Sequence, residues 1–104
     1  MISINLPSFN FDIKICEKNK NYKVAILVDT KEKLAAVFEN IKSQLSLNSI
    51  RSLIYTYNSY KISFKNGSFI DIIFCKKEPC QNSYDMIDSR LIKYKNWTKI
   101  FGYA

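Results

Sequence analysis

The chain contains little glycine: among its 104 residues the glycines are Gly67 and Gly102. A phosphate-binding loop of the form G-x-x-x-x-G-K-[ST] needs two glycines five residues apart, because backbone N–H groups can surround a phosphate only where side chains leave room. The positions of the two glycines cannot supply such a loop. The sequence therefore excludes a P-loop nucleotide-binding site.

Histidine is absent. Without it no side chain titrates near neutral pH by default, and Ser/His dyads, Cys/His dyads and histidine-containing zinc sites are excluded. The cysteines are Cys16, Cys75 and Cys80, and one C-x-x-x-x-C spacing without a second ligand pair predicts neither a disulfide framework nor a zinc ribbon. We expect free, mostly buried thiols, and we expect no metal, no cofactor and no catalytic residue.

Long apolar runs are also missing, since the longest extends from Val24 to Val28. Together with the lack of a basic leader, this predicts neither a signal peptide nor a membrane span, so we expect a cytoplasmic protein. A length of 104 residues is typical of one small domain, which we expect to cover residues 1–104.

Acidic residues are scarce. Sixteen Lys and Arg residues face nine Asp and Glu residues, which gives a formal net charge of +7. Codons rich in A and T account for abundant lysine, but they also encode glutamate, so they do not account for the imbalance. No acid follows Asp88, whereas four cations do. The charge favours an anionic partner.

The periodicity of the apolar residues predicts the first elements. Four apolar residues alternate with polar ones near the N-terminus, which predicts a half-buried strand: Phe9, Phe11, Ile13 and Ile15. The run from Lys23 to Val28 is apolar after its first residue, which predicts a central strand covered on both faces.

An amphipathic helix is predicted from about residue 31 to residue 46. Its apolar residues recur at helical spacing: Leu34, Val37, Phe38, Ile41 and Leu45. Asp29 or Thr30 can cap the helix, with Glu32 completing the carboxylate form of a capping box.

A β-hairpin is predicted over about residues 60–75, after a further β-rich run at residues 50–57. Its turn is Asn66-Gly67, the dipeptide preferred where two turn residues both need positive φ. With a two-residue loop, the facing pairs are Phe64 with Phe69, Ile62 with Asp71 and Tyr60 with Ile73. This pairing leaves Asp71 as the polar residue of an apolar strand, so we expect it at a bulge or an exposed rim, with a functional carboxylate as the alternative.

The C-terminal part gives mixed signals. Ile87, Leu91 and Tyr94 fit one helical face, whereas residues 97–103 are rich in β-formers. We expect a short helix or loop and then a strand. The predicted fold class is α/β: a small mixed β-sheet with the helix at 31–46 and the hairpin at 60–75.

Three segments together resemble a known family. The strand from Lys23 to Thr30 with its helix is similar to the second strand and following helix of the ATPase domain of phage terminase large subunits, the motors that package DNA. The stretch from Tyr60 to Ile70, with its Asn-Gly-Ser, is similar to a hairpin of that family. Ser89-Arg90 and the residues up to Gly102 are similar to the segment before its Walker B strand. The resemblance covers about four fifths of the chain and implies a phage or mobile-element origin. If a phage encodes the protein, we expect it in the host cytoplasm.

The sequence departs from that family at the catalytic positions. Residues 1 to 21 predict a strand instead of a P-loop, Leu91 stands where the family has glycine after its arginine, and the Walker B acids would fall near Tyr103 and Ala104. Such a motor needs a phosphate-binding lysine, a carboxylate for Mg²⁺ and a second one to activate water. The resemblance therefore implies a scaffold without ATPase activity; the alternative is an independent strand–helix–hairpin pattern.

Candidate catalytic groups are few. Asp85 and Asp88, with Asp71 nearby in sequence, are the acids that a small metal-dependent nuclease would have to bring together. Acids on polar turns are usually only solvated, so this is the weakest alternative. A cysteine nucleophile would lack a histidine base.

Cations and aromatic residues are interleaved in two regions, which favours nucleic-acid binding. Phosphates attract the cations, and exposed rings stack on unpaired bases at about 1–3 kcal/mol each, although rings at strand spacing are also typical of a core. The predicted contacts are Arg90, Lys93, Tyr94, Lys95, Trp97, Lys99, Lys61 and Lys65. We predict a non-catalytic protein that binds a nucleic acid or a nucleoprotein complex of the host, as an accessory factor or inhibitor of a defence or replication machine. The alternative is a terminase-derived DNA-packaging component.

Overall fold

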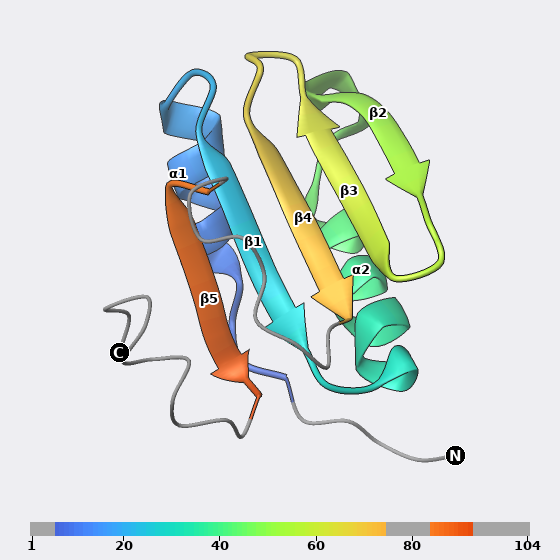
Figure 1. The fold of residues 1–104 in the computed structure, drawn as a ribbon. Coiled ribbons are helices and arrows are strands. Elements are labelled where there is room, and N and C mark those ends of the chain that lie inside the picture. Colours follow the sequence, from blue (N-terminus) through green and yellow to red (C-terminus); the bar gives the residue numbers. More distant parts are fainter. Residues whose placement is uncertain (1–5, 75–83, 93–104) are drawn as a thin grey trace.

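The computed structural model describes residues 6–74 and 84–92, which form one five-stranded sheet and two α-helices (Figure 1). The elements in chain order are α1 (Asn10–Lys18), β1 (Lys23–Val28), α2 (Lys31–Gln44), a 3₁₀ turn η1 (Leu47–Ser49), β2 (Ile50–Tyr55), β3 (Ser59–Phe64), β4 (Phe69–Phe74) and β5 (Met86–Leu91).

The strand order in the sheet is β2-β3-β4-β1-β5. The central strand β1 runs parallel to both β4 and β5, whereas β3 is antiparallel to β2 and to β4. Val24 to Val28 are fully buried. The mixed sheet confirms the predicted α/β class, and the burial of β1 confirms its prediction as a central strand.

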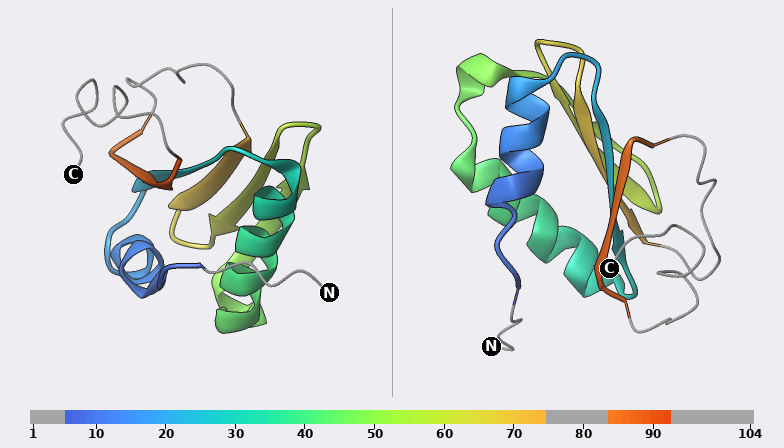
Figure 2. Two further views of the ribbon diagram at one scale, coloured as in Figure 1. Left: turned by 90° about the horizontal axis from the view of Figure 1, so that it is seen from below. Right: turned by 90° about the vertical axis from the view of Figure 1, so that its left-hand side faces the viewer.

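Both helices pack on the same face of the sheet (Figure 2). The core on this face joins side chains of α1, α2, β1, β3 and β4, among them Phe9, Ile26, Leu34, Ile62 and Ile72. The opposite face carries a smaller apolar cluster around Leu27 and Ile87. Within the described residues no helix covers that opposite face.

The helix α2 confirms the predicted amphipathic helix and ends two residues earlier than expected. Its N-cap is Thr30, whose hydroxyl accepts a hydrogen bond from the Lys33 backbone N–H at 3.1 Å. The neighbouring Asp29 instead accepts a hydrogen bond from the Lys33 ammonium at 2.8 Å. Both candidate caps therefore hold the first turn, one through the backbone and one through a side chain.

The prediction of a strand at residues 9–15 was wrong, because this segment forms α1. Phe9, Ile13 and Cys16 are buried along one helical face, while Phe11 is 63% exposed. The spacing of three and four residues is that of a helix against the sheet, and it coincides with the alternation of Phe9, Phe11 and Ile13 over so short a stretch.

The hairpin between β3 and β4 forms, but its predicted register was wrong by one residue. Lys61 pairs with Asp71 and Ile62 with Ile70. The loop holds three residues rather than two, since the Phe64 N–H donates to the Ser68 carbonyl at 2.8 Å. A three-residue loop with glycine in the left-handed position is the next commonest hairpin connection, and Gly67 has φ +90°.

Two further expectations are corrected on the strands. Met86 to Leu91 form a strand rather than a helix, because this segment pairs with β1 and adds an edge to the sheet. Asp71 lies within β4, partly buried between Ala25 and Lys61, and not at a bulge or an exposed rim. The predicted strand at residues 97–103 lies outside the described residues.

Replacing Gly67 with alanine should destabilise the fold by about 1–3 kcal/mol, because a residue with a Cβ is strained at positive φ. The added Cβ would also lie 2.1 Å from Asn21 Oδ1, so that side chain must move. Urea denaturation measures the loss, and the exposed Asn48→Ala on η1 is the control, with an expected change within about 0.5 kcal/mol. Equal stability of both variants would contradict this account of the turn.

Candidate functional site

Of the eight predicted contact residues, Arg90, Lys61 and Lys65 belong to the described part of the chain. The other five lie outside it: Lys93, Tyr94, Lys95, Trp97 and Lys99. The structure does not gather the three described cations into one patch. Arg90 lies on β5 and points toward α1, Lys61 lies three strands away on the opposite face, and Lys65 lies in the β3–β4 loop.

Arg90 forms an ion pair with the buried Asp88 carboxylate instead of a free cationic surface. Its Nε lies 2.9 and 3.1 Å from the two carboxylate oxygens of Asp88, and its Nη2 lies 2.6 Å from Oδ2. The same Nη2 donates to the Ser8 carbonyl at 3.0 Å and lies 3.6 Å from Asp12 Oδ2. The guanidinium also lies over the Phe9 ring, 5.6 Å from its centroid. Because Asp88 largely neutralises the charge of the guanidinium, Arg90 is a weak phosphate contact.

Two carboxyl groups meet at this ion pair, and both are only 1% exposed. Burial, together with the hydrogen bond and the charge of Asp88, raises the pKa of Asp12 to about 8 against the opposing charge of Arg90. The hydrogen bonds from Arg90 hold the pKa of Asp88 below its ordinary value against the opposing effect of burial. At neutral pH Asp12 is therefore protonated and Asp88 ionised, so one cation serves one anion.

This carboxyl cluster does not have the arrangement of a nuclease site. Asp88 faces the helices, whereas Asp71 lies on the opposite face of the sheet, where its Oδ2 accepts a hydrogen bond from Tyr84 at 2.8 Å. Asp85 is engaged by the Lys23 backbone N–H at 2.9 Å. The three acids that the nuclease interpretation needs thus do not converge, and no group of three metal-ligating side chains lies within residues 6–74 and 84–92.

Cys16, the cysteine in the described part of the chain, is likewise unsuited to act as a nucleophile. Cys16 is a free and fully buried thiol, as predicted, and its Sγ lies 3.6 Å from the Phe69 carbonyl. Burial and two nearby acids raise its pKa to about 12, so the reactive thiolate is not formed near neutral pH.

The outer strands form a second candidate site, the β2–β3 arm, which we define as residues 50–65. This arm is part of a longer acid-free stretch, since residues 40–70 contain no Asp or Glu. It carries Arg51, Lys61 and Lys65 together with three tyrosines. In the described part of the sheet β2 pairs only with β3, so its outer edge is open.

Two tyrosine rings of the β2–β3 arm pack against α2, and the third extends into solvent. Tyr55 and Tyr60 contact Phe38 of α2 in edge-to-face geometry, with ring centroids 5.2 and 5.1 Å from that ring. Tyr57, in the loop between β2 and β3, is 83% exposed. The Lys31 ammonium lies 3.6 Å from the Tyr57 ring centroid and donates a hydrogen bond to the Tyr57 carbonyl, which fixes the loop.

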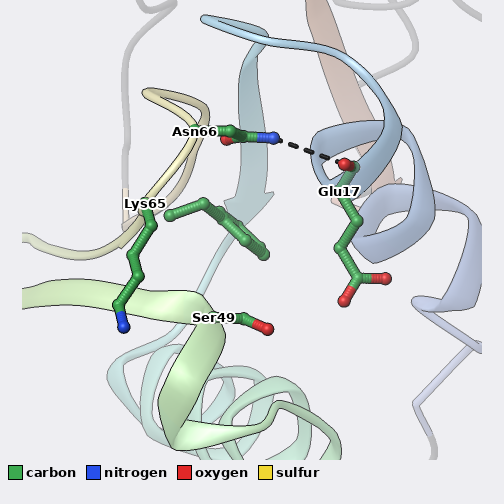
Figure 3. A pocket seen from close by; sticks show the side chains of 5 residues that line it. Glu17, Ser49, Lys65 and Asn66 are labelled. Atoms are coloured by element: carbon green, nitrogen blue, oxygen red, sulfur yellow. Dashed lines mark hydrogen bonds between the residues drawn. The ribbon is translucent and has the colours of Figure 1, made fainter.

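A hollow of about 210 Å³ lies at the base of the β2–β3 arm, between the end of α1, the turn η1 and the β3–β4 loop (Figure 3). Its lining residues are Glu17, Ser49, Phe64, Lys65 and Asn66. This hollow was not predicted, because its lining comes from three separate parts of the chain. Lys65 alone was expected to take part in binding.

The contact between Lys31 and Tyr57 was also missed, since the two residues are 26 positions apart and no local pattern links them. Asp88 and Arg90 could have been found. Their separation of two places both on one face of a strand, and the helical interpretation of that segment concealed the pair.

None of the helices in the described residues is both long and apolar enough to cross a bilayer. Comparisons with protein-family models, with curated proteins and with solved structures gave no match.

Proposed function

We propose that this protein is a non-catalytic binding protein that holds single-stranded nucleic acid on its β2–β3 arm. The observation that carries the proposal is the combination of exposed rings and cations on an acid-free hairpin, with Tyr57 displayed beside Lys31. Phosphates attract the cations, and unpaired bases stack on exposed rings without sequence preference. A cytoplasmic location gives access to such strands.

The position of the arm supports this function. Arg51 is exposed on the outermost strand β2, and Lys61 lies on the sheet face that no described helix covers, 4.2 Å above the Phe69 ring centroid. A strand lying along β2 and the loop would meet Arg51 first and then Tyr57. The tail cations Lys93, Lys95 and Lys99 extend this proposal as predicted phosphate contacts.

The triple variant Arg51→Gln, Lys61→Gln, Lys65→Gln should bind a labelled single strand of about 16 nucleotides more weakly and with less dependence on salt. Each phosphate contact contributes about 0.7 to the slope of log affinity against log salt for single strands, so the slope should fall by about 2. Tyr57→Ala should weaken binding by about tenfold or more, because one stacking contact is lost. Fluorescence anisotropy between about 50 and 200 mM salt measures both.

The control for charge is the variant Lys14→Gln, Lys18→Gln, Lys20→Gln, which removes the same charge from α1 and the turn after it, away from the arm. It should change the slope by less than the arm variant. Equal slopes for both triple variants, or no measurable binding by the wild type at about 50 mM salt, would refute the assignment to the arm. Lys93→Gln, Lys95→Gln, Lys99→Gln tests the tail in the same assay.

A second candidate is a protein partner within a host nucleoprotein complex, with this chain as its accessory factor or inhibitor. The open edge of β2 favours it, since Ile54 and Tyr55 are both exposed there and an unpaired strand edge can accept a strand of another protein. Pull-down with and without nuclease separates the two: a partner protein that survives nuclease supports the second candidate over the first.

The terminase-derived packaging component is the third candidate. The helix α1 directly precedes β1, as the P-loop helix precedes the second strand in the ATPase domain that the sequence resembles. The chain still has no P-loop glycines, so the expected role is structural. Binding to double-stranded DNA in preference to single strands would favour this candidate.

A further inference from the structure

The hollow at the base of the β2–β3 arm has walls that are fixed to one another by hydrogen bonds. The Asn66 side-chain amide donates to the carbonyl of Cys16 at 2.7 Å and to that of Asn19 at 3.3 Å, which ties the β3–β4 loop to the end of α1. The Lys65 backbone N–H donates to the Ser49 carbonyl at 3.0 Å, which ties the same loop to η1. The hollow is therefore preformed without using the charged groups of its lining.

Two opposite charges flank this hollow. Glu17 and Lys65 lie on opposite sides of it, with the Ser49 hydroxyl between them (Figure 3). Among the described residues neither charged group has an ion-pair partner, and the two do not pair with each other. Because Glu17 is in the last turn of α1, the negative end of the helix dipole adds to its attraction for a cation.

We propose that the hollow binds a small zwitterion of the amino-acid class. The ligand's ammonium group binds the Glu17 carboxylate, and its carboxylate binds the Lys65 ammonium. Charge-assisted hydrogen bonds at both ends distinguish such a ligand from ions of one sign. The Ser49 hydroxyl can donate to the carboxylate or accept from the ammonium group.

The size of the hollow suits a small ligand. About 210 Å³ equals the liquid volume of about seven water molecules, which suits ligands with a similar number of non-hydrogen atoms. Small amino acids such as glycine, alanine, serine and 4-aminobutyrate are in this range. Drug-sized ligands and nucleotides occupy larger pockets, of about 300–1,000 Å³.

NMR titration of the ¹⁵N-labelled full chain tests the proposal. The probes are those four amino acids, with acetate and ethylamine as analogues that carry one charge each. We expect shifts at Glu17, Ser49, Lys65 and Asn66, and binding of at least one amino acid that is more than tenfold tighter than that of either analogue. No shifts at these residues with any amino acid, or equal binding of the singly charged analogues, would overturn the proposal.

Glu17→Gln and Lys65→Gln should each weaken binding of the amino acid by about tenfold or more, since each removes one charge-assisted contact. The matched controls are Glu39→Gln on α2 and Lys20→Gln before β1, both exposed, which should bind as the wild type does. Wild-type binding by both hollow variants would place the ligand elsewhere and overturn the assignment.

Glu17→Gln also separates this inference from nucleic-acid binding, in which Lys65 takes part as well. Removal of the Glu17 carboxylate should weaken binding of the amino acid, whereas binding of single-stranded nucleic acid should be equal or tighter. Loss of nucleic-acid binding by the arm variant without any amino-acid binding by the wild type would refute the inference while the proposed function stands.

Discussion

Arg90→Gln should lower the free energy of unfolding by about 2–4 kcal/mol, one of the two largest effects that we expect. The change leaves the Asp88 carboxylate, which is 1% exposed, without its cation and without three hydrogen bonds from Arg90 side-chain nitrogens. Breaking a buried pair on one side typically costs about 3–5 kcal/mol, and we reduce this figure because the guanidinium is 40% exposed. Urea denaturation at pH 7 measures the loss.

A second change on the same pair shows where the loss comes from. In Asp88→Asn, Arg90→Gln no buried charge is left over, so the double variant should be more stable than Arg90→Gln alone. Arg51→Gln is the matched control on an exposed strand and should change stability by no more than about 0.5 kcal/mol. If Arg90→Gln costs no more than this control, the guanidinium does not hold the cluster together.

This ion pair also changes which of the cations after Asp88 are expected to contact phosphate. Arg90 was predicted as the first residue of a phosphate-binding patch, and it instead pairs with Asp88 within β5 and joins this strand to the residues before α1 through the Ser8 carbonyl. Its loss would weaken nucleic-acid binding only through loss of structure. Tests of binding should therefore leave Arg90 intact and change the cations of the β2–β3 arm.

The elements that were predicted correctly are those whose apolar residues fit only one periodicity. The helix α2 has an apolar face of several turns with a cap at Thr30, and β1 is an unbroken apolar run, so local patterns determine both. In α1 a nine-residue helix buries Phe9, Ile13 and Cys16, and this spacing overlaps the alternation of a strand. Tertiary packing decides such a short segment, and the sequence alone does not show which surface it meets.

The candidate sites were less predictable because they depend on contacts between distant residues. The exposed rings and cations of the β2–β3 arm were found from composition, since Tyr57 and Lys61 lie close in sequence. The hollow requires the end of α1, η1 and the β3–β4 loop to meet, and the Asn66 side chain makes this contact across about fifty positions. No periodic pattern encodes that meeting.

Asp12→Asn should make the protein more stable at pH 8 to 9 and should remove most of its loss of stability between about pH 4 and pH 8. Burial and Asp88 raise the pKa of Asp12 to about 8 in the folded state, compared with 3.8 for an ordinary aspartate. Over this range the folded protein keeps a proton that the unfolded chain releases, so the free energy of unfolding falls as pH rises. One pKa unit corresponds to about 1.4 kcal/mol, which makes the total on the order of 5 kcal/mol.

The asparagine has the shape of the protonated aspartate and cannot ionise, and its amide can donate to the Asp88 carboxylate as the acid does. Below pH 4 the free energy of unfolding changes with pH in the opposite direction, because of Asp88. Its pKa is held low, so its contribution to stability is lost as it takes up a proton in strong acid. Urea denaturation at several pH values should therefore show a wild-type maximum near pH 4 and a flatter profile for Asp12→Asn, with exposed Glu39→Gln as the control that keeps the wild-type slope. Parallel profiles for the wild type and Asp12→Asn would mean that Asp12 is ionised in the folded protein, and that Arg90 serves two anions rather than one.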